Sequence, residues 1–139
     1  MNWLVWSLLS AVFAGFTAIL AKIGVRDVDS NLATAIRTTV VLAIAWAVSI
    51  ATFKSGSFSA LSVRTWLFLG LSGIATGLSW LCYFRALQLG DVSRVAPIDK
   101  LSVLFVIVFS SVFLGESLTG RTLIGGGLLT AGAIVLAWE

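Results

Sequence analysis

The sequence contains no histidine, one cysteine and one proline, and charged residues make up only 11% of it. Without histidine or a cysteine cluster, a zinc site is excluded. Cys82 has no second cysteine to pair with inside the chain, so we interpret it as a small packing residue. A soluble domain averages about 25% charged residues, so this shortage of charge argues against a soluble fold.

Other functional classes also lack their sequence signatures. The net charge of +3 is spread thinly and no basic run is present, which argues against a nucleic-acid partner. Gly125-Gly126-Gly127 lies inside an apolar run and lacks the strand and lysine of a phosphate-binding loop. Since no nucleophile–base pair appears either, we expect no catalytic residue, no bound metal and no cofactor.

Long apolar runs dominate the chain instead. Hydrophobic residues make up 59% of the sequence, and the mean hydropathy is +1.07. Each of five runs is close to the ~20 residues that a helix needs to cross the hydrocarbon of a bilayer. Inside lipid the backbone must satisfy its own hydrogen bonds, which favours helices.

We therefore predict an all-α integral membrane protein, a bundle of five transmembrane helices that forms one domain over residues 1–139. The predicted spans are 3–21, 32–53, 65–87, 95–114 and 121–138. Because no basic segment precedes Trp3, the first run is predicted to be an uncleaved span and not a signal peptide.

The third predicted span carries polar side chains along one face. At about 100° per residue, four of them fall within about 60° of one another. They are Ser72, Thr76, Ser79 and Tyr83. Two interpretations stay open: the face lines a polar cavity, or its hydroxyls bond back to their own helix. Trp80 borders this face, where it would either stack on a substrate or be buried as a structural residue.

The fourth predicted span contains an adjacent acid and base, Asp99 and Lys100, shortly after Pro97. Neighbours on a helix point about 100° apart, so these two need not pair with each other. An ionisable group inside a span costs about 2.5–3.5 kcal/mol to insert. We predict that Asp99, with Arg37 or Lys22 as its partner, binds substrate or a coupling ion. The alternative is that the helix begins near Pro97 and both charges lie at the membrane interface.

The predicted substrate site collects these polar groups between the helices. Its residues are Asp99, Arg37, Ser72, Thr76, Ser79, Tyr83, Trp80 and Ser102. Helix packing is predicted along small residues at four-residue spacing, since small side chains let helices approach closely in lipid. These packing residues are Gly73 with Gly77, and Gly127 with Ala131.

The distribution of basic residues predicts the orientation of the chain. Loops one and three, with the span ends beside them, hold six of them: Lys22, Arg26, Arg37, Arg85, Arg94 and Lys100. The opposite side holds three: Lys54, Arg64 and Arg121. Because cytoplasmic loops carry the excess of lysine and arginine, loops one and three and the C-terminus are predicted to be cytoplasmic.

Four stretches of the chain carry a resemblance to a known family. They read FTAILAKIGV, ATAIRTTVVLA, YFRALQLGDVSRVAPIDKLSVLF and FLGESLTGRTLIGGGLLTAGAIVL. In this order, and over nearly the whole chain, they resemble one EamA domain of the drug/metabolite transporter superfamily. The most specific parts are the turn Leu114-Gly115-Glu116, Arg37 early in the second span, and Lys22 at the end of the first.

The resemblance implies a multi-pass transporter of the cytoplasmic membrane, commonly an exporter of small metabolites, amino acids or toxic compounds. In form the chain is similar to the short, five-helix bacterial and archaeal members. The small multidrug-resistance relatives use a carboxylate in the first helix, and the run 3–21 contains no acid. Proton-coupled export of cationic drugs by that mechanism is therefore not expected.

The number of spans predicts a partner. Most members of the superfamily carry two such domains as inverted repeats, and alternating access usually rests on two repeats of this kind. Five spans cannot form that arrangement alone, so we expect an antiparallel homodimer or a companion subunit in the lipid bilayer. The alternative is a non-transporting membrane subunit that assembles with a partner. In that case substitutions on the polar face of the third span are silent, and the glycine seams are sensitive.

Overall fold

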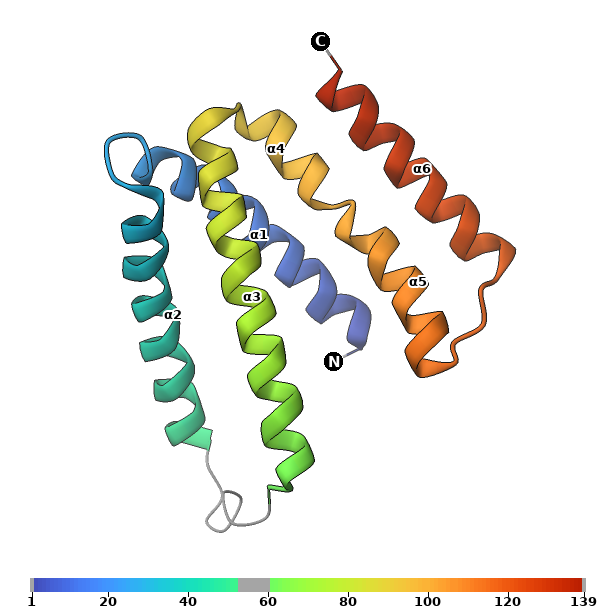
Figure 1. Ribbon diagram of the computed structural model, residues 1–139, viewed down its shortest axis with the longest axis horizontal. Coiled ribbons are helices and arrows are strands. Elements are labelled where there is room, and N and C mark those ends of the chain that lie inside the picture. The colour runs from blue at the N-terminus through green and yellow to red at the C-terminus, as the bar shows by residue number, and fades with distance from the viewer. Residues whose placement is uncertain (1, 53–60, 139) are drawn as a thin grey trace. The chain divides into compact units, whose positions relative to one another are not determined.

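The computed structural model describes residues 2–52 and 61–138 of the chain. All regular elements in these two ranges are α-helices (Figure 1). They are α1 (Trp3–Gly24), α2 (Ser30–Thr52), α3 (Val63–Leu89), α4 (Val92–Asp99), α5 (Ser102–Leu114) and α6 (Gly120–Ala137). Lys54, which contributes to the predicted charge bias, lies outside the described residues.

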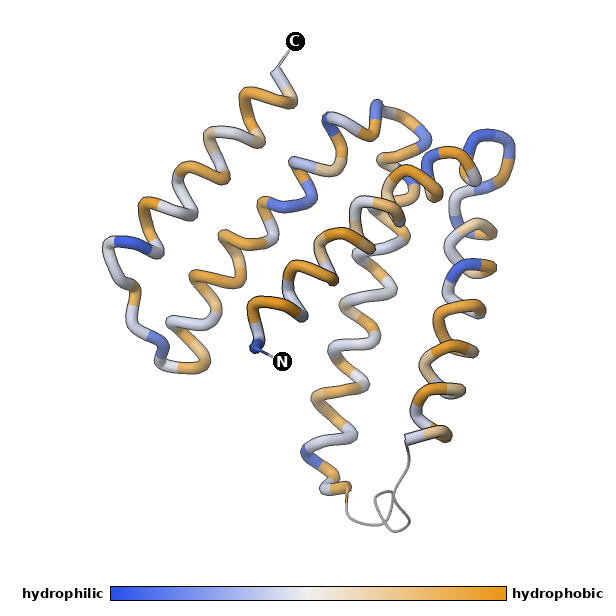
Figure 2. The backbone as a smooth tube through the Cα atoms, turned by 180° about the vertical axis from the view of Figure 1, so that it is seen from behind, coloured by the Kyte–Doolittle hydropathy of each residue, from blue (hydrophilic) through white to orange (hydrophobic). Residues whose placement is uncertain are grey.

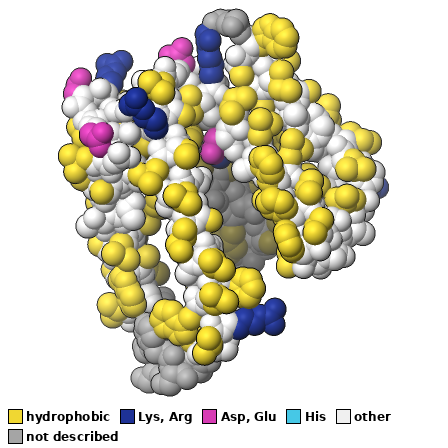
Figure 3. All heavy atoms as spheres, in the orientation of Figure 1, with side chains coloured by type: hydrophobic (Ala, Val, Ile, Leu, Met, Phe, Trp, Pro, Cys, Tyr) yellow, Lys and Arg dark blue, Asp and Glu magenta, His cyan; other side chains and the backbone are white. Residues whose placement is uncertain are grey.

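Five segments of the described chain are long and apolar enough to cross a membrane. They are α1, α2, α3, α4 together with α5, and α6. The largest differences from the predicted ends are three residues, at Gly24 and at Val92. Hydrophobic residues run along these segments, and hydrophilic ones gather at the turns and at the α4–α5 junction (Figure 2). Hydrophobic side chains are spread along the helices on the visible face (Figure 3). The prediction of an all-α membrane fold is confirmed.

The fourth span is not the single helix that the sequence predicted. Its helix begins at Val92, so Pro97 lies inside α4 and not in the first turn. Proline has no N–H, and the carbonyl of Ser93 therefore loses its helical donor. The helix then breaks at Lys100 and Leu101, which separate α4 from α5.

The backbone at this break adopts tighter turns. The amide of Lys100 donates to the carbonyl of Pro97 at 3.1 Å, and that of Leu101 donates to Ile98 at 3.0 Å. Bonds to the third preceding residue are the pattern of a 3₁₀ turn, which often marks a hinge or a strained stretch of helix. The fourth span is therefore discontinuous close to its acid and base.

The chain divides into two units, residues 1–20 with 89–139, and residues 21–88. In the first unit, α6 packs against α4 and α5. The close approach is at Gly126, where an added Cβ would lie 3.1 Å from Ile107 Cδ1 and 3.3 Å from Leu104 Cδ2. Thr119 begins α6 by accepting a hydrogen bond from the amide of Thr122 at 3.2 Å, an N-cap.

In the second unit, the turn after α1 is fastened to the end of α3 by side-chain hydrogen bonds. Lys22 Nζ donates to the carbonyl of Leu87 at 2.6 Å. Gln88 Nε2 donates to the carbonyls of Val25 and Val28 at 3.2 and 2.6 Å. Val25 and Leu87 are 1% and 0% exposed, so these bonds surround a small apolar core. These bonds hold the turn between α1 and α2 against the C-terminal end of α3.

Candidate substrate-binding site

Arg37 lies inside the second span and is held by aromatic rings of α3. It follows Ser30, the first residue of α2, by seven positions, or about 10 Å along the helix axis. Its guanidinium carbon lies 4.1 Å from the ring centroid of Trp80 and 5.6 Å from that of Phe84. Phe84 is 3% exposed, so the rings form a fixed platform under the charge.

The sequence of α2 places Arg37 toward α3 by simple periodicity. Ser30, Thr34 and Arg37 follow one another at the spacing that puts residues on one helix face. Ser30 and Thr34 are 4% and 6% exposed. Thr34 Oγ1 donates to the carbonyl of Ser30 at 2.8 Å, so its hydroxyl is satisfied within the helix. This face of α2 is therefore buried at Ser30 and Thr34, and the charged side chain of Arg37 lies about one turn beyond Thr34 along the helix.

The hydrogen bonding of the Arg37 guanidinium is incomplete within residues 2–52 and 61–138. Among the residues that the structure describes, Arg37 Nη1 is a buried side-chain nitrogen that has no hydrogen-bond partner. Stacking on aromatic rings contributes about 0.5–2 kcal/mol. Inserting the charge in a span costs about 2.5–3.5 kcal/mol. The rings therefore offset only part of that cost, and the N–H donors of Nη1 stay open for an acceptor.

The third span presents two different sides. Trp80 and Phe84, one turn apart, stack under Arg37, and Leu87 continues the same stripe into the core. Tyr83 is half-buried, and its ring centroid lies 6.5 Å from that of Phe84. The structure thus brings together three members of the predicted site, Arg37, Trp80 and Tyr83.

The remaining polar residues of α3 lie at earlier turns. Ser72, Thr76 and Ser79 are exposed in the described chain. Thr76 Oγ1 donates to the carbonyl of Ser72 at 2.9 Å, which is the bond back to its own helix that the sequence left open. That these hydroxyls line a substrate cavity stays a prediction.

The second charged position lies at the break between α4 and α5, in the other unit. Lys100 Nζ and Asp99 Oδ2 form an ion pair at 3.3 Å, with side chains 59% and 36% exposed. The sequence did not require these two neighbours to pair with each other, but in the structure they do. Ser102 begins α5 and is exposed. The predicted partnership of Asp99 with Arg37 or Lys22 joins the two units and stays a prediction.

Phe84 and Gly126 have roles that the sequence reasoning missed. Phe84 shares the stripe of Trp80 and Leu87, a spacing of four and three residues that could have been read from the sequence. In α6 the buried small residues are Gly126 and Ala133. Gly127 and Ala131, the predicted packing residues, are exposed. They follow Gly126 by one and by five positions, which places both on a different face of the helix.

The predicted GxxxG pair on α3 also meets no neighbour inside the described chain. A Cβ added at Gly73 or Gly77 would have no described atom within 4 Å, apart from its own helix. The same holds for Gly127. These positions are therefore available for contact with lipid or another molecule, and their role in helix packing stays a prediction.

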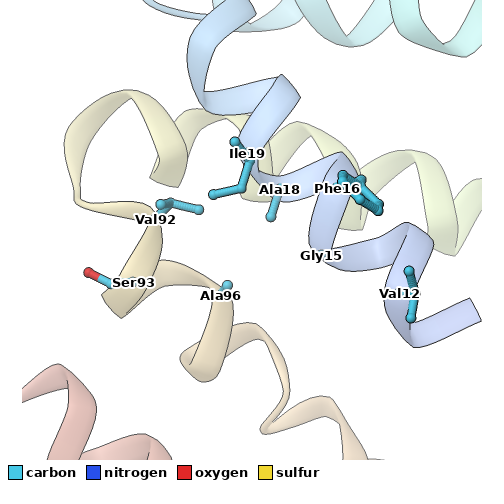
Figure 4. A pocket seen from close by; sticks show the side chains of 8 residues that line it. All are labelled: Val12, Gly15, Phe16, Ala18, Ile19, Val92, Ser93 and Ala96. Carbon is cyan, nitrogen blue, oxygen red and sulfur yellow. The ribbon is translucent and has the colours of Figure 1, made fainter. Parts of the chain in front are cut away.

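An apolar groove of about 620 Å³ runs between α1 and α4 in the first unit (Figure 4). Its lining residues are Val12, Gly15, Phe16, Ala18, Ile19, Val92, Ser93 and Ala96. Substrate sites combine an apolar lining with a few convergent polar groups. Ser93 is the single polar side chain in this lining, so the groove does not have the chemistry of a polar substrate site.

Comparison with known proteins identifies the family. A model of the EamA-like transporter family matches residues 1–138. The chain belongs to this family. It is also 52% identical, over 136 residues, to a Sinorhizobium sp. protein named "Uncharacterized transporter in cobO 3'region". That alignment covers 98% of this chain and 96% of the relative. No solved structure matches the chain significantly.

These findings confirm the predicted family and make the protein a multi-pass membrane transporter. The five-helix, single-domain size agrees with the short form that the sequence resembles. A transporter of this kind lies in the bilayer and takes small molecules as substrates. In a membrane transporter, a buried arginine donor that lacks a partner among the described residues is a candidate group for substrate binding.

Proposed function

We propose that this protein exports small metabolites or related compounds across the cytoplasmic membrane of a bacterium or archaeon. The proposal rests mainly on Arg37 Nη1, a buried donor inside a membrane span that has no hydrogen-bond partner in the described part of the chain. Ionisable groups in spans mark substrate or ion pathways, because the cost of inserting them is otherwise not recovered. The direction, export, rests on the resemblance to short EamA proteins.

Two copies of opposite orientation would form the working carrier. Alternating access usually needs two inverted repeats around a central site, and one chain supplies five spans. A second inverted copy, or a separately encoded companion subunit, supplies the other five. The exposed small residues Gly127 and Ala131 of α6 offer a surface on which another helix can approach closely.

Within each copy, Asp99 would bind the substrate or a coupling ion. It lies beside a break in the fourth span, and discontinuous helices supply ion and substrate ligands in many transporters. The ion pair with Lys100 is partly exposed, so an incoming cation or substrate can compete for the carboxylate. In the other unit, the hydroxyls of Ser72, Thr76 and Ser79 on α3 are further candidate substrate ligands.

The orientation follows the predicted charge bias. Loops one and three and the C-terminus would be cytoplasmic, since six of nine basic residues lie on that side. Single cysteines at Ser57 and at Asp91, introduced into a Cys82→Ser background, report the side by labelling with a membrane-impermeant reagent. Stronger labelling from outside at Ser57 than at Asp91 is expected, with some labelling at Asp91 if the partner is an inverted copy of the same chain. A cytoplasmic Ser57 in most molecules would overturn the assignment.

Transport is tested by a ligand screen followed by a flux measurement. Compounds that raise the unfolding temperature of the purified protein are candidate substrates, because a ligand that binds only the folded state stabilises it. Each compound is then loaded into cells with and without the protein. Faster loss of a stabilising compound from expressing cells is expected. If no stabilising compound leaves faster, and substitutions on the polar face of α3 are silent, the protein is a non-transporting subunit.

A further inference from the structure

We infer that Arg37 binds the carboxylate of a monoanionic organic substrate, and that Trp80 positions the guanidinium for it. This inference rests on the proposed transport function and names the class of substrate. It begins from Arg37 Nη1, which is buried and lacks a hydrogen-bond partner among the described residues. A buried N–H donor in an apolar environment requires an acceptor, and none is supplied by residues 21–52 and 61–88.

The aromatic contacts leave the donors of the guanidinium available. Trp80 lies 4.1 Å below the guanidinium carbon and Phe84 5.6 Å from it, so both rings interact with the charge through their π systems. Such contacts use none of the N–H groups of arginine, which form a rigid fork that fits a carboxylate in two parallel hydrogen bonds. The platform therefore holds Arg37 in place and leaves the N–H donors of Nη1 without a partner among the described residues.

The acids of the same unit have other positions or partners. Asp29 Oδ1 accepts hydrogen bonds from the amides of Asn31 and Leu32, both at 3.0 Å, at the start of α2. Asp27 lies in the turn before it, outside the span. Among the described residues of this unit, neither acid forms an ion pair with Arg37. The acceptor that Arg37 lacks is thus to be supplied from outside residues 21–88.

The charge of the surroundings favours a carboxylate over a phosphate. Arg37 carries one positive charge, and a carboxylate neutralises it with one negative charge. A phosphate dianion would need a second cation at the same place. Lys22, another basic residue of this unit, donates instead to the carbonyl of Leu87 near the C-terminal end of α3. Arg85 donates to Gln88 Oε1 at 3.0 Å and is exposed.

The experiment measures binding of simple acids and of their neutral counterparts to the full chain in lipid nanodiscs. The probes are acetate and benzoate, with acetamide and benzamide as uncharged molecules of the same shape, and inorganic phosphate. We expect the unfolding temperature to rise with the acids and not with the amides. Arg37→Gln should weaken benzoate binding at least about tenfold, the loss expected when a charge-assisted hydrogen bond is removed.

Arg64 offers a matched control. Its guanidinium carbon lies 5.7 Å from the ring centroid of Phe68, so it is also an arginine over an aromatic ring, but at the start of α3. Arg64→Gln should leave the affinity for benzoate unchanged. Arg37→Lys keeps the charge without the fork, and should bind benzoate more weakly than wild type and more tightly than Arg37→Gln. This variant also serves if Arg37→Gln does not fold.

Trp80 acts as a positioning residue, and aromatic replacement distinguishes this role. Trp80→Leu should weaken benzoate binding a few-fold because the guanidinium loses its platform, and Trp80→Phe should restore most of the affinity. Equal losses in the two variants would overturn the positioning role of the ring.

Other outcomes overturn the assignment of Arg37. Equal stabilisation by acids and amides, tighter binding of phosphate, or no binding of either acid would each contradict it. Binding of benzoate only after Asp99→Asn would show that Asp99, and not the substrate, occupies Arg37. Efflux of a neutral or cationic compound without acid binding would refute the inference and keep the proposed transport. Acid binding through Arg37 without any flux would refute transport and keep the site.

Discussion

The two units hold an ionisable group inside an apolar span in different ways. In the second unit, Arg37 rests on Trp80 and Phe84, and its Nη1 has no hydrogen bond among the described residues. In the first unit, Asp99 pairs with its neighbour Lys100 where the helix breaks. One arrangement keeps the helix intact and leaves a donor open. In the other arrangement the helix is interrupted and the charged group forms an ion pair with its neighbour.

The two units also differ in the contacts that hold their helices together. The second unit fastens its turn to α3 with hydrogen bonds from Lys22 and Gln88 to backbone carbonyls. The first unit relies on close contact of apolar side chains with a glycine, at Gly126. A unit fastened by directional bonds near its charged group keeps that group in fixed geometry. A unit held by apolar contact around a broken helix has fewer constraints on rearrangement.

The largest effect is expected when the acid at the break loses its charge. Asp99→Asn should reduce export of a stabilising compound to the background of cells without the protein, because the amide cannot bind a cation or a cationic group. The unfolding temperature should stay close to that of wild type, since the ion pair is partly exposed and contributes about 0–1 kcal/mol. Wild-type flux in this variant would return Asp99 to an interfacial, structural role.

The next largest effect is expected where α6 packs closely against α5, at Gly126. Gly126→Val should lower the free energy of unfolding by about 1–3 kcal/mol, the cost of overpacking, because its Cβ would press on Ile107 and Leu104. The matched control is Gly127→Val, which meets no described atom within 4 Å. Denaturant titration in detergent micelles measures both. Equal destabilisation by the two variants would mean that α6 does not pack through Gly126.

A comparable test in the second unit removes the side-chain hydrogen bonds of Gln88, and its effect should be local. Gln88→Leu removes the two hydrogen bonds that the amide donates to Val25 and Val28, each worth about 0.5–1.5 kcal/mol, and the exposed one that it accepts from Arg85. Hydrogen exchange should increase in the turn between α1 and α2 and stay unchanged in α6. Unchanged exchange in that turn would show that Gln88 is not what fastens it.

The smallest effect concerns the break itself. Pro97→Ala restores an N–H that can donate to the carbonyl of Ser93, and favours a continuous helix across Lys100 and Leu101. We expect slower amide exchange at these two positions with little change in global stability. Exchange that is as fast as in the wild type would show that the break does not depend on the proline.

The sequence predicted the spans well because length and hydropathy determine them. It predicted Arg37, Trp80 and Tyr83 as site residues but could not place them together, because periodicity on one helix does not say which neighbour it meets. The break after Pro97 was missed because proline is tolerated in a first turn, and the start of the helix was expected three residues too late. The choice of Gly126 over Gly127 depends on which face of α6 meets α5.

The most direct test of the account is the stability and ligand response of Arg37→Met. If Arg37 is kept for a substrate, removing its insertion cost of about 2.5–3.5 kcal/mol should outweigh the lost ring contacts of up to about 2 kcal/mol. The variant should then be about 1 kcal/mol more stable than wild type without ligand and should no longer be stabilised by benzoate. A variant that is less stable than wild type, and that still responds to benzoate, would contradict the account.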